Sequence, residues 1–301
     1  MIKNIIILIF VFSIYKVHSQ VNGEVFAVDR NIFYLNYTPA AVEDDLYDYQ
    51  QANIKLGLPP IRLNKLTIYN TIGADYHHFN YGESPFSENI DAFYNLNLST
   101  LIQYRLSKSW TINALAMPHI LSNLKSNFET DDMRINGILF AEKIFRKKDS
   151  NNFFSLSFGV GYLTLAGETK INPVINLMAR VNEKLSFVLG IPNTYVQYDF
   201  NNRHTLKVLG DLNDFSANIS TPFYATNDNL TKAKTAISTK ISAGIEYNYW
   251  FYNNWGMMLK GVYSVHDQYE LQDSNGNTIY DFNSKLKPYF ALGIKYRLKK
   301  K

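Results

Sequence analysis

The 301-residue chain contains no cysteine. This absence excludes disulfides, thiol catalysis, cysteine-ligated metal and a lipid-anchored N-terminal cysteine. The chain also lacks any run of 18 or more apolar residues, which a helical membrane protein needs. Positive and negative charges nearly balance, so the formal net charge of the chain is only +4. The basic residues are dispersed, apart from the tail Lys299 to Lys301, so nucleic-acid binding is excluded as a function.

Aromatic residues, in contrast, are abundant, with 22 tyrosines and 20 phenylalanines. Aromatic side chains favour β-strands, and they form the girdles at both interfaces of outer-membrane barrels. A soluble all-β protein can also be rich in tyrosine. Composition therefore favours β structure and leaves the choice between a barrel and a soluble sandwich to the pattern of the strands.

The N-terminus reads as an export signal. Lys3 supplies a basic region, Ile5 to Ile14 is apolar, and Val17 and Ser19 are small enough for cleavage before Gln20. The apolar stretch is too short for a membrane anchor. We therefore expect residues 1–19 to be a cleaved Sec signal peptide and residues 20–301 to form one domain, because no linker or low-complexity stretch interrupts them.

The segment from Ser284 to Leu298 shows the strongest period-2 pattern. Leu286, Phe290, Leu292 and Ile294 alternate with small, aromatic and basic residues, which predicts a strand with one apolar and one polar face. Its length suits a strand that crosses a bilayer, for which about 9–11 residues are needed. We expect it to close a barrel by pairing with a first strand near Asn31–Tyr37, with its apolar face toward lipid.

Similar alternation recurs along the chain, and counting gives about 14 strands, or 12 if the shortest pairs merge. Short connections alternate with longer ones, as in outer-membrane barrels; the short ones are residues 107–109, 147–152, 182–184, 201–203 and 253–254. Aromatic residues such as Tyr104 and Trp110 flank these turns. The sequence thus predicts an all-β, antiparallel transmembrane up-and-down β-barrel in the bacterial outer membrane, with both termini on the periplasmic side. A soluble two-sheet sandwich is the alternative.

The leader, the tyrosine-rich strands, the turn Arg105–Trp110 and the segment Leu189–Tyr195 together resemble an uncharacterised outer-membrane β-barrel family of Bacteroidota, a domain-of-unknown-function family. This resemblance covers about the whole mature chain. The family has no assigned reaction, so the resemblance implies a location and a fold only.

Two clusters hold side chains of the types that catalysis or metal binding needs. Asp75 and His77 share a strand face while His78 points to the other, and no nucleophile elbow accompanies them. The acidic turn at Asp273 to Asp281 contains Gly276 at the wrong place for a calcium loop, and Asn275-Gly276 is a hairpin tip by itself. We predict no enzyme activity, no catalytic or metal-binding residue and no cofactor.

The polar faces of the predicted strands carry more basic than acidic residues. Rings of Lys or Arg favour anions in pores, so these residues are candidates for lining the lumen: Arg105, Arg134, Arg180, Lys207, Lys240, Lys260, Lys285, Lys287, Lys295 and Arg297.

We expect a monomeric pore or uptake channel for small hydrophilic, including anionic, solutes, with membrane lipid and the barrel assembly machinery as partners. The alternatives are a non-conducting structural or surface-binding barrel and, less favoured, a barrel lipid hydrolase. Whether the segment from Val21 to Asp45 plugs the lumen is left open by the sequence.

Overall fold

The computed structural model describes residues 26–27, 30–40, 47–81, 87–146, 151–165, 168–190, 194–225, 231–252 and 254–297. The predicted signal peptide lies outside these residues. No helix in the described part of the chain has the length and apolar character needed to cross a membrane.

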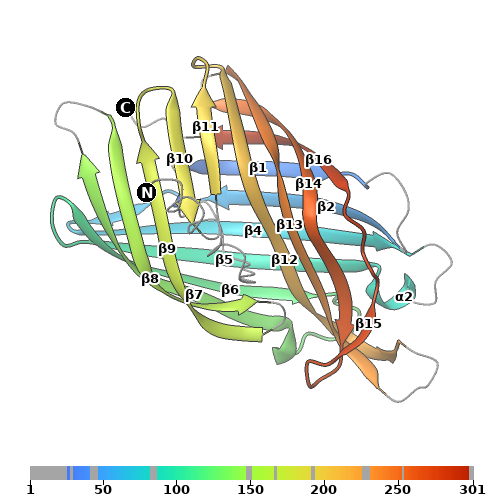
Figure 1. The fold of residues 1–301 in the computed structure, drawn as a ribbon. Helices are drawn as coiled ribbons and strands as arrows, with labels where there is room; N and C mark the ends of the chain where they lie inside the picture. The colour runs from blue at the N-terminus through green and yellow to red at the C-terminus, as the bar shows by residue number, and fades with distance from the viewer. Residues whose placement is uncertain are drawn as a thin grey trace, which may run out of the picture.

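The fold is a closed antiparallel barrel of 14 strands (Figure 1). The wall strands, in chain order, are β1 (Asn31–Thr38), β2 (Asp48–Gly57), β4 (Leu66–Asn80), β5 (Ala92–Arg105), β6 (Trp110–Ser122), β7 (Met133–Arg146), β8 (Phe153–Leu165), β9 (Glu168–Arg180), β10 (Leu185–Gly190), β11 (Thr194–Asp199), β12 (His204–Tyr224), β13 (Lys232–Tyr252), β14 (Trp255–Gln272) and β16 (Pro288–Arg297). Four short elements lie off the wall: β3 (Ile61–Leu63), α2 (Ser87–Ile90), η2 (Thr130–Asp132) and β15 (Thr278–Asp281).

The last strand closes the barrel on the first, as predicted. Asn31 pairs with Arg297 and Leu35 with Ile294. We call the end of the barrel that holds Asn31 and Arg297 the terminal end, and the opposite end the loop end. Two strand boundaries differ from the prediction. β16 begins only at Pro288. The alternation along the chain also predicts separate strands at residues 204–209 and 215–219, and the structure joins them in the single strand β12.

The outer surface is apolar and the inner surface is polar. Leu292, Ile175 and Ile245 are 60%, 64% and 54% exposed, whereas Asn113 and Asn176 are each 1% exposed. This arrangement is the reverse of a water-soluble protein, and it matches a barrel that meets lipid outside and water or polar side chains inside. It excludes the two-sheet sandwich.

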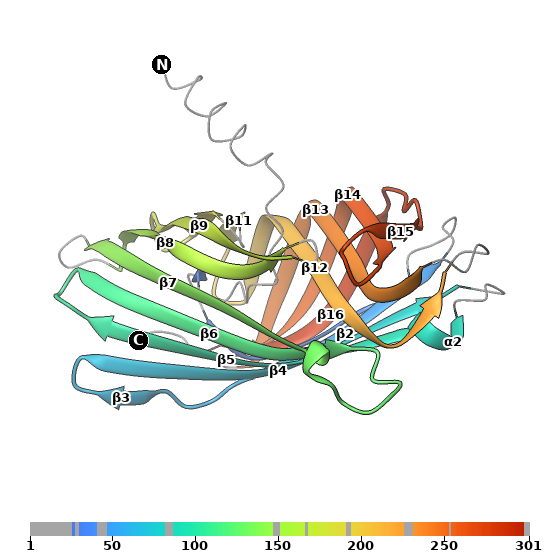
Figure 2. The ribbon, with the colours of Figure 1, turned by 90° about the horizontal axis from the view of Figure 1, so that it is seen from below.

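The strand β12 leaves the barrel wall at the loop end and reaches across to β6. Asn218 of β12 forms a parallel bridge with Ser122 of β6. The N–H of Asn123 donates to the carbonyl of Asn218 over 3.2 Å, and the side chain of Asn218 donates to Asp132 over 2.7 Å. Figure 2 shows the loop-end part of β12 beside the end of β6. At this level β12 therefore bypasses the five strands β7 to β11.

The bypass leaves a smaller ring of nine strands at the loop end, and aromatic side chains fill it. A ring of about 8 strands is narrow enough for side chains to fill. Tyr269 stacks between Phe79 and Phe282, with ring centroids 4.5 Å apart on each side, and its hydroxyl lies 2.6 Å from that of Tyr81. We call this cluster the aromatic cap; its other buried members include Tyr47, Tyr49, Phe93, Phe215 and Tyr289.

We predict that Asn123→Ala loosens the attachment of β12 to β6. The Asn123 amide oxygen accepts hydrogen bonds from the N–H and hydroxyl of Ser220 at 2.9 and 2.7 Å, and its NH₂ donates to the Asn89 carbonyl at 2.7 Å. Leaving these buried partners unsatisfied costs about 1–3 kcal/mol. Amide hydrogen exchange of residues 214–220 should accelerate. The variant Asn127→Ala, at an exposed position of the same loop, should leave exchange unchanged; equal protection in both variants would contradict the prediction.

Candidate functional site

A polar chamber lies in the lumen below the aromatic cap. Its volume is about 350 Å³. Polar side chains line most of it, because alternate residues of each strand point inward. They include Asn36, Asn53, Lys55, Asp75, His77, Asn95, Asn97, His119, Lys207, Asp211, Asn213, Lys240, Glu246, Lys260 and Lys295. Fourteen strands form a barrel wider than side chains alone fill, and this chamber is the space that remains.

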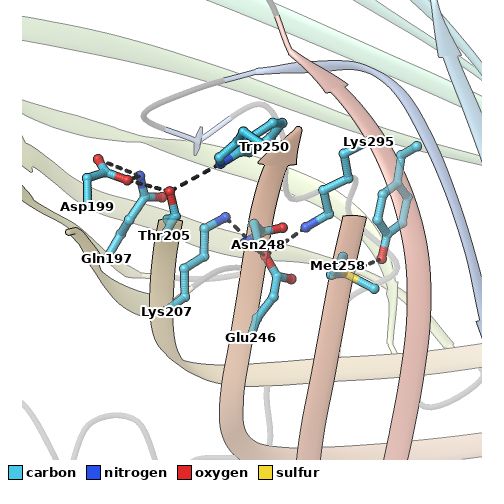
Figure 3. Close-up of polar contacts among 10 residues, drawn as sticks. Gln197, Asp199, Thr205, Lys207, Glu246, Asn248, Trp250, Met258 and Lys295 are labelled. Atoms are coloured by element: carbon cyan, nitrogen blue, oxygen red, sulfur yellow. Dashed lines mark hydrogen bonds and ion pairs between the residues drawn. The ribbon is translucent and has the colours of Figure 1, made fainter. Parts of the chain in front are cut away.

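Three lysines gather around two carboxylates on one wall of the chamber. Lys295 lies 2.7 Å from Glu246, and Lys207 lies 3.5 Å from the same carboxylate oxygen. Lys260 forms an ion pair with Asp211. We call this group the lysine cluster; Figure 3 shows Lys207 and Lys295 approaching Glu246 from two sides. The cluster carries three ammonium groups against two carboxylates.

The register of β12, β13 and β14 explains the lysine cluster. Lys207 is directly opposite Glu246, and Glu246 is directly opposite Lys260. Cross-strand neighbours of opposite charge attract each other. Asn248, two residues along β13, donates to Glu246 over 2.9 Å and fixes its orientation. Glu246 is therefore the centre of the cluster, and Lys295 reaches it from β16.

A second charged group supports the cap from below. The Lys240 ammonium lies 3.7 Å from the ring centroid of Tyr289 and 4.2 Å from that of Tyr49, a cation–π arrangement. It also lies 3.8 Å from Asp267, to which the Tyr289 hydroxyl donates over 2.6 Å. The Tyr49 hydroxyl is 2.8 Å from Nδ1 of His77. These contacts tie the chamber roof to the aromatic cap.

Phe26, which precedes β1 in the chain, lies inside the lumen near the terminal end. Phe26 is 2% exposed and packs with Leu101, Leu115 and Phe140, the last at a ring distance of 5.0 Å. A second cavity, of about 690 Å³, lies on the terminal side of this contact. Ala27 and Asn31 border both cavities, so the segment at Phe26 separates them.

The second cavity is strongly basic. Five basic residues line it against one carboxylate, Glu142: Arg30, Arg62, Arg105, Lys108 and Arg146. The Arg30 guanidinium also lies 4.5 Å from the ring centroid of Tyr69. An anion that approaches from the terminal end therefore meets a positive vestibule before it reaches Phe26.

The candidate basic residues of the sequence occupy several different places. Lys207, Lys240, Lys260 and Lys295 line the chamber, and Arg105 lines the basic vestibule. Lys287 and Arg297 are buried, with the Arg297 guanidinium 3.6 Å from the Trp250 ring centroid. Arg134 is half-buried opposite His119 on β6, and Arg180 is half-buried opposite Phe153 on β8. Lys285 is exposed and precedes β16.

Several site residues were not singled out from the sequence. Lys55 and Asp211 line the chamber, and both occupy alternating positions that period-2 reading can assign to the inner face. Phe26 gave no signal, because its segment has no periodicity. His77 faces the chamber while His78 stacks with Tyr76, as expected for neighbours on one strand. Asp273 accepts backbone hydrogen bonds from Asn275 and Asn277 within its turn, and its hydrogen bonds from Asn277 lower its pKa.

A closed antiparallel barrel with an apolar outer face and a polar lumen has the architecture of outer-membrane barrel proteins. The chain belongs to the family described as Domain of unknown function (DUF6268), whose model matches residues 62–297. A search of curated proteins finds no match.

Comparison with solved structures finds two porins and a transporter among its matches. A KdgM porin in complex with disordered oligogalacturonate has 7% identity and a TM-score of 0.36, over 88% of this chain and 99% of that one. A NanC porin has 9% identity and a TM-score of 0.38, over 88% and 100%. The toluene transporter TodX of Pseudomonas putida has 10% identity and a TM-score of 0.37, over 94% of each chain. Identities of this size leave function undetermined.

We predict that Glu246→Gln destabilises the barrel. Removing this carboxylate leaves Lys207 and Lys295 close together without the negative charge between them, and loss of one partner of a buried ion pair is costly. Contact of the chamber with water reduces the cost, so we expect about 1–3 kcal/mol. Urea unfolding in detergent measures it. Glu183→Gln, at an exposed turn position, is the control, and equal midpoints for the two variants would refute the prediction.

Proposed function

We propose that this protein is a gated outer-membrane channel for small hydrophilic, anionic solutes. The observation that carries the proposal is the polar chamber, a space of about 350 Å³ with a lysine cluster on its wall, in a barrel of 14 strands. We place the barrel as a monomer in the outer membrane of a Gram-negative bacterium, as the resemblance to the Bacteroidota family implies. Its lipid-facing surface and the barrel assembly machinery are then its permanent and transient partners.

Gating follows from the two closures of the lumen. Most of the aromatic cap comes from wall strands, among them Phe79, Phe215 and Tyr269, so these side chains move only if the strands move. The closure at the terminal end, in contrast, depends on Phe26, which belongs to no strand. A side chain held by apolar packing is displaced at lower cost than a hydrogen-bonded wall. We infer that Phe26 is the movable gate.

Selectivity for anions follows from charge. The basic vestibule raises the local concentration of anions at the terminal end, and the lysine cluster offers them ammonium groups further in. Glu246 and Asp211 neutralise two of the three lysines of the cluster, so the field is positive but weak. Weak binding of the anion to the lysine cluster favours its passage through the channel, because the anion must also dissociate from the cluster.

A second candidate function is a non-conducting barrel that binds a partner through its loops. The aromatic cap favours this reading, because it closes the loop end with buried side chains. We infer that the protein is not an enzyme; release of fatty acid from phospholipid by the refolded protein would contradict this.

The test is conductance of the refolded protein in planar bilayers. We expect small, brief openings for the native chain and a several-fold larger open probability for Phe26→Ser, because the gate loses its apolar anchor. Phe128→Ser, at a residue 54% exposed in a loop, is the matched control and should behave as the native chain.

The selectivity of the channel between anions and cations provides a second measurement, in which two variants should shift the reversal potential in opposite directions. Glu246→Gln should shift the reversal potential toward anion selectivity, and Lys295→Gln should shift it toward cations. A refolded barrel that conducts in none of these variants would favour the loop-binding function. Equal reversal potentials in all of these variants would be consistent with a channel but would refute a role of the lysine cluster in its selectivity.

A further inference from the structure

The basic vestibule has the size and the mixed lining of a ligand pocket. Its volume is about 690 Å³, and ligand pockets of proteins measure about 300–1,000 Å³ and combine apolar surface with a few polar groups. The vestibule has both kinds of lining, whereas polar side chains line most of the chamber. Ser107, Lys108 and Ser109, in the turn between β5 and β6, border it at the terminal end. A molecule from that side therefore enters the vestibule without passing Phe26.

The basic residues of the vestibule are not engaged by acidic ones. Glu142, the acidic residue of the described lining, accepts a hydrogen bond from the Thr111 hydroxyl at 3.4 Å. Within the described part of the chain, no ion pair joins a carboxylate to any of the five basic residues of the lining, which are Arg30, Arg62, Arg105, Lys108 and Arg146. The lining therefore has four positive charges in excess, and anionic groups of a ligand are what would balance them.

The arrangement of strands spaces three of these guanidinium groups apart. Arg62, Arg105 and Arg146 belong to β3, β5 and β7, and the strands β3 to β7 are neighbours in that order. The backbones of alternate strands in a sheet are about 10 Å apart. A guanidinium binds one carboxylate or phosphate group through two parallel hydrogen bonds. An anion with a single such group thus engages one arginine in this way, whereas a molecule with two groups engages two.

The inner end of the vestibule is apolar and rich in rings. Phe26, Leu101, Leu115 and Phe140 line it and are buried in one cluster, and the half-buried Phe153 borders it as well. Removing apolar surface from water is favourable, and aromatic rings pack well against each other in offset or tilted arrangements. An inorganic anion leaves this surface wet. A flat ring carried by the ligand covers it.

We propose that the basic vestibule binds an aromatic molecule that carries at least two carboxylate or phosphate groups, with its ring toward Phe26 and its acidic groups toward the arginines. The proposal rests on the proposed function, since it takes the vestibule as the entrance for anions. It adds a ligand class that is held at the entrance. A molecule bound there occupies the axial route on the terminal side of Phe26, so it blocks the passage of smaller anions.

The binding test varies the charge and the ring of the ligand separately. The probe is isophthalate, a benzene ring with two carboxylates, titrated calorimetrically into the refolded protein in non-ionic detergent at neutral pH. Benzoate keeps the ring and has one carboxylate, and glutarate keeps two carboxylates at a similar spacing without a ring. We expect isophthalate to bind at least tenfold more tightly than either. Comparable affinity for benzoate or glutarate, or no binding of isophthalate, would overturn the proposal.

Three matched variants locate the bound isophthalate. Arg105→Gln and Arg146→Gln each remove one guanidinium of the lining at an exposed position. Arg203→Gln makes the same change in the exposed turn between β11 and β12, which is at the terminal end but outside the described lining. We expect the first two variants to weaken binding at least fivefold and Arg203→Gln to change it less than twofold. Heat-dependent gel mobility checks that all three fold, and equal affinities in the three would contradict the site.

Conductance separates this site from the channel. Isophthalate added to one side of a planar bilayer at a time should reduce the small-anion currents of the native chain from one side only, because the vestibule opens at the terminal end. Block should weaken in Arg105→Gln and persist in Arg203→Gln. Currents without binding of isophthalate would refute the vestibule site and keep the channel. Binding of isophthalate without currents in any variant would refute the channel and keep the site, and binding without block would refute its place on the axial route.

Discussion

The parallel bridge between β12 and β6 is the contact on which the interior of this barrel depends. A regular 14-strand barrel has one lumen of uniform width, which side chains do not fill. By crossing to β6, β12 divides the loop end into a nine-strand ring and an outer flap of β7, β8 and β9. The ring is narrow enough to be filled by the aromatic cap, and the chamber is the part of the lumen that lies below it.

The electrostatics of the chamber depend on strand register in the same way. Pairing of Lys207 with Glu246 and of Glu246 with Lys260 places opposite charges side by side on the inner wall. A shift of one residue would move all three side chains to the lipid face, where charges are costly. The lysine cluster therefore stabilises the register of β12, β13 and β14, and the same register keeps its charge inside the barrel.

The closures of the chamber differ in kind, and this difference bears on function. Most residues of the aromatic cap lie on the hydrogen-bonded wall strands, so opening it requires those strands to move. Phe26 closes the terminal side by packing in a buried apolar cluster that includes Leu101, Leu115 and Phe140.

The sequence by itself determined the architecture. Inward and outward positions follow from a period of two residues, which is a local property, so alternation predicted about 14 strands, the closure of β16 on β1 and the apolar outer surface. It also placed Lys207, Lys240, Lys260 and Lys295 on polar faces, which the structure brings to one chamber. Only the tertiary structure decided which carboxylate each lysine meets, where β12 leaves the wall, and that Phe26 enters the lumen. These depend on contacts between residues far apart in the chain. Asn218 and Ser122 carry no local pattern that pairs them, and Phe26 lies in a segment with no pattern at all.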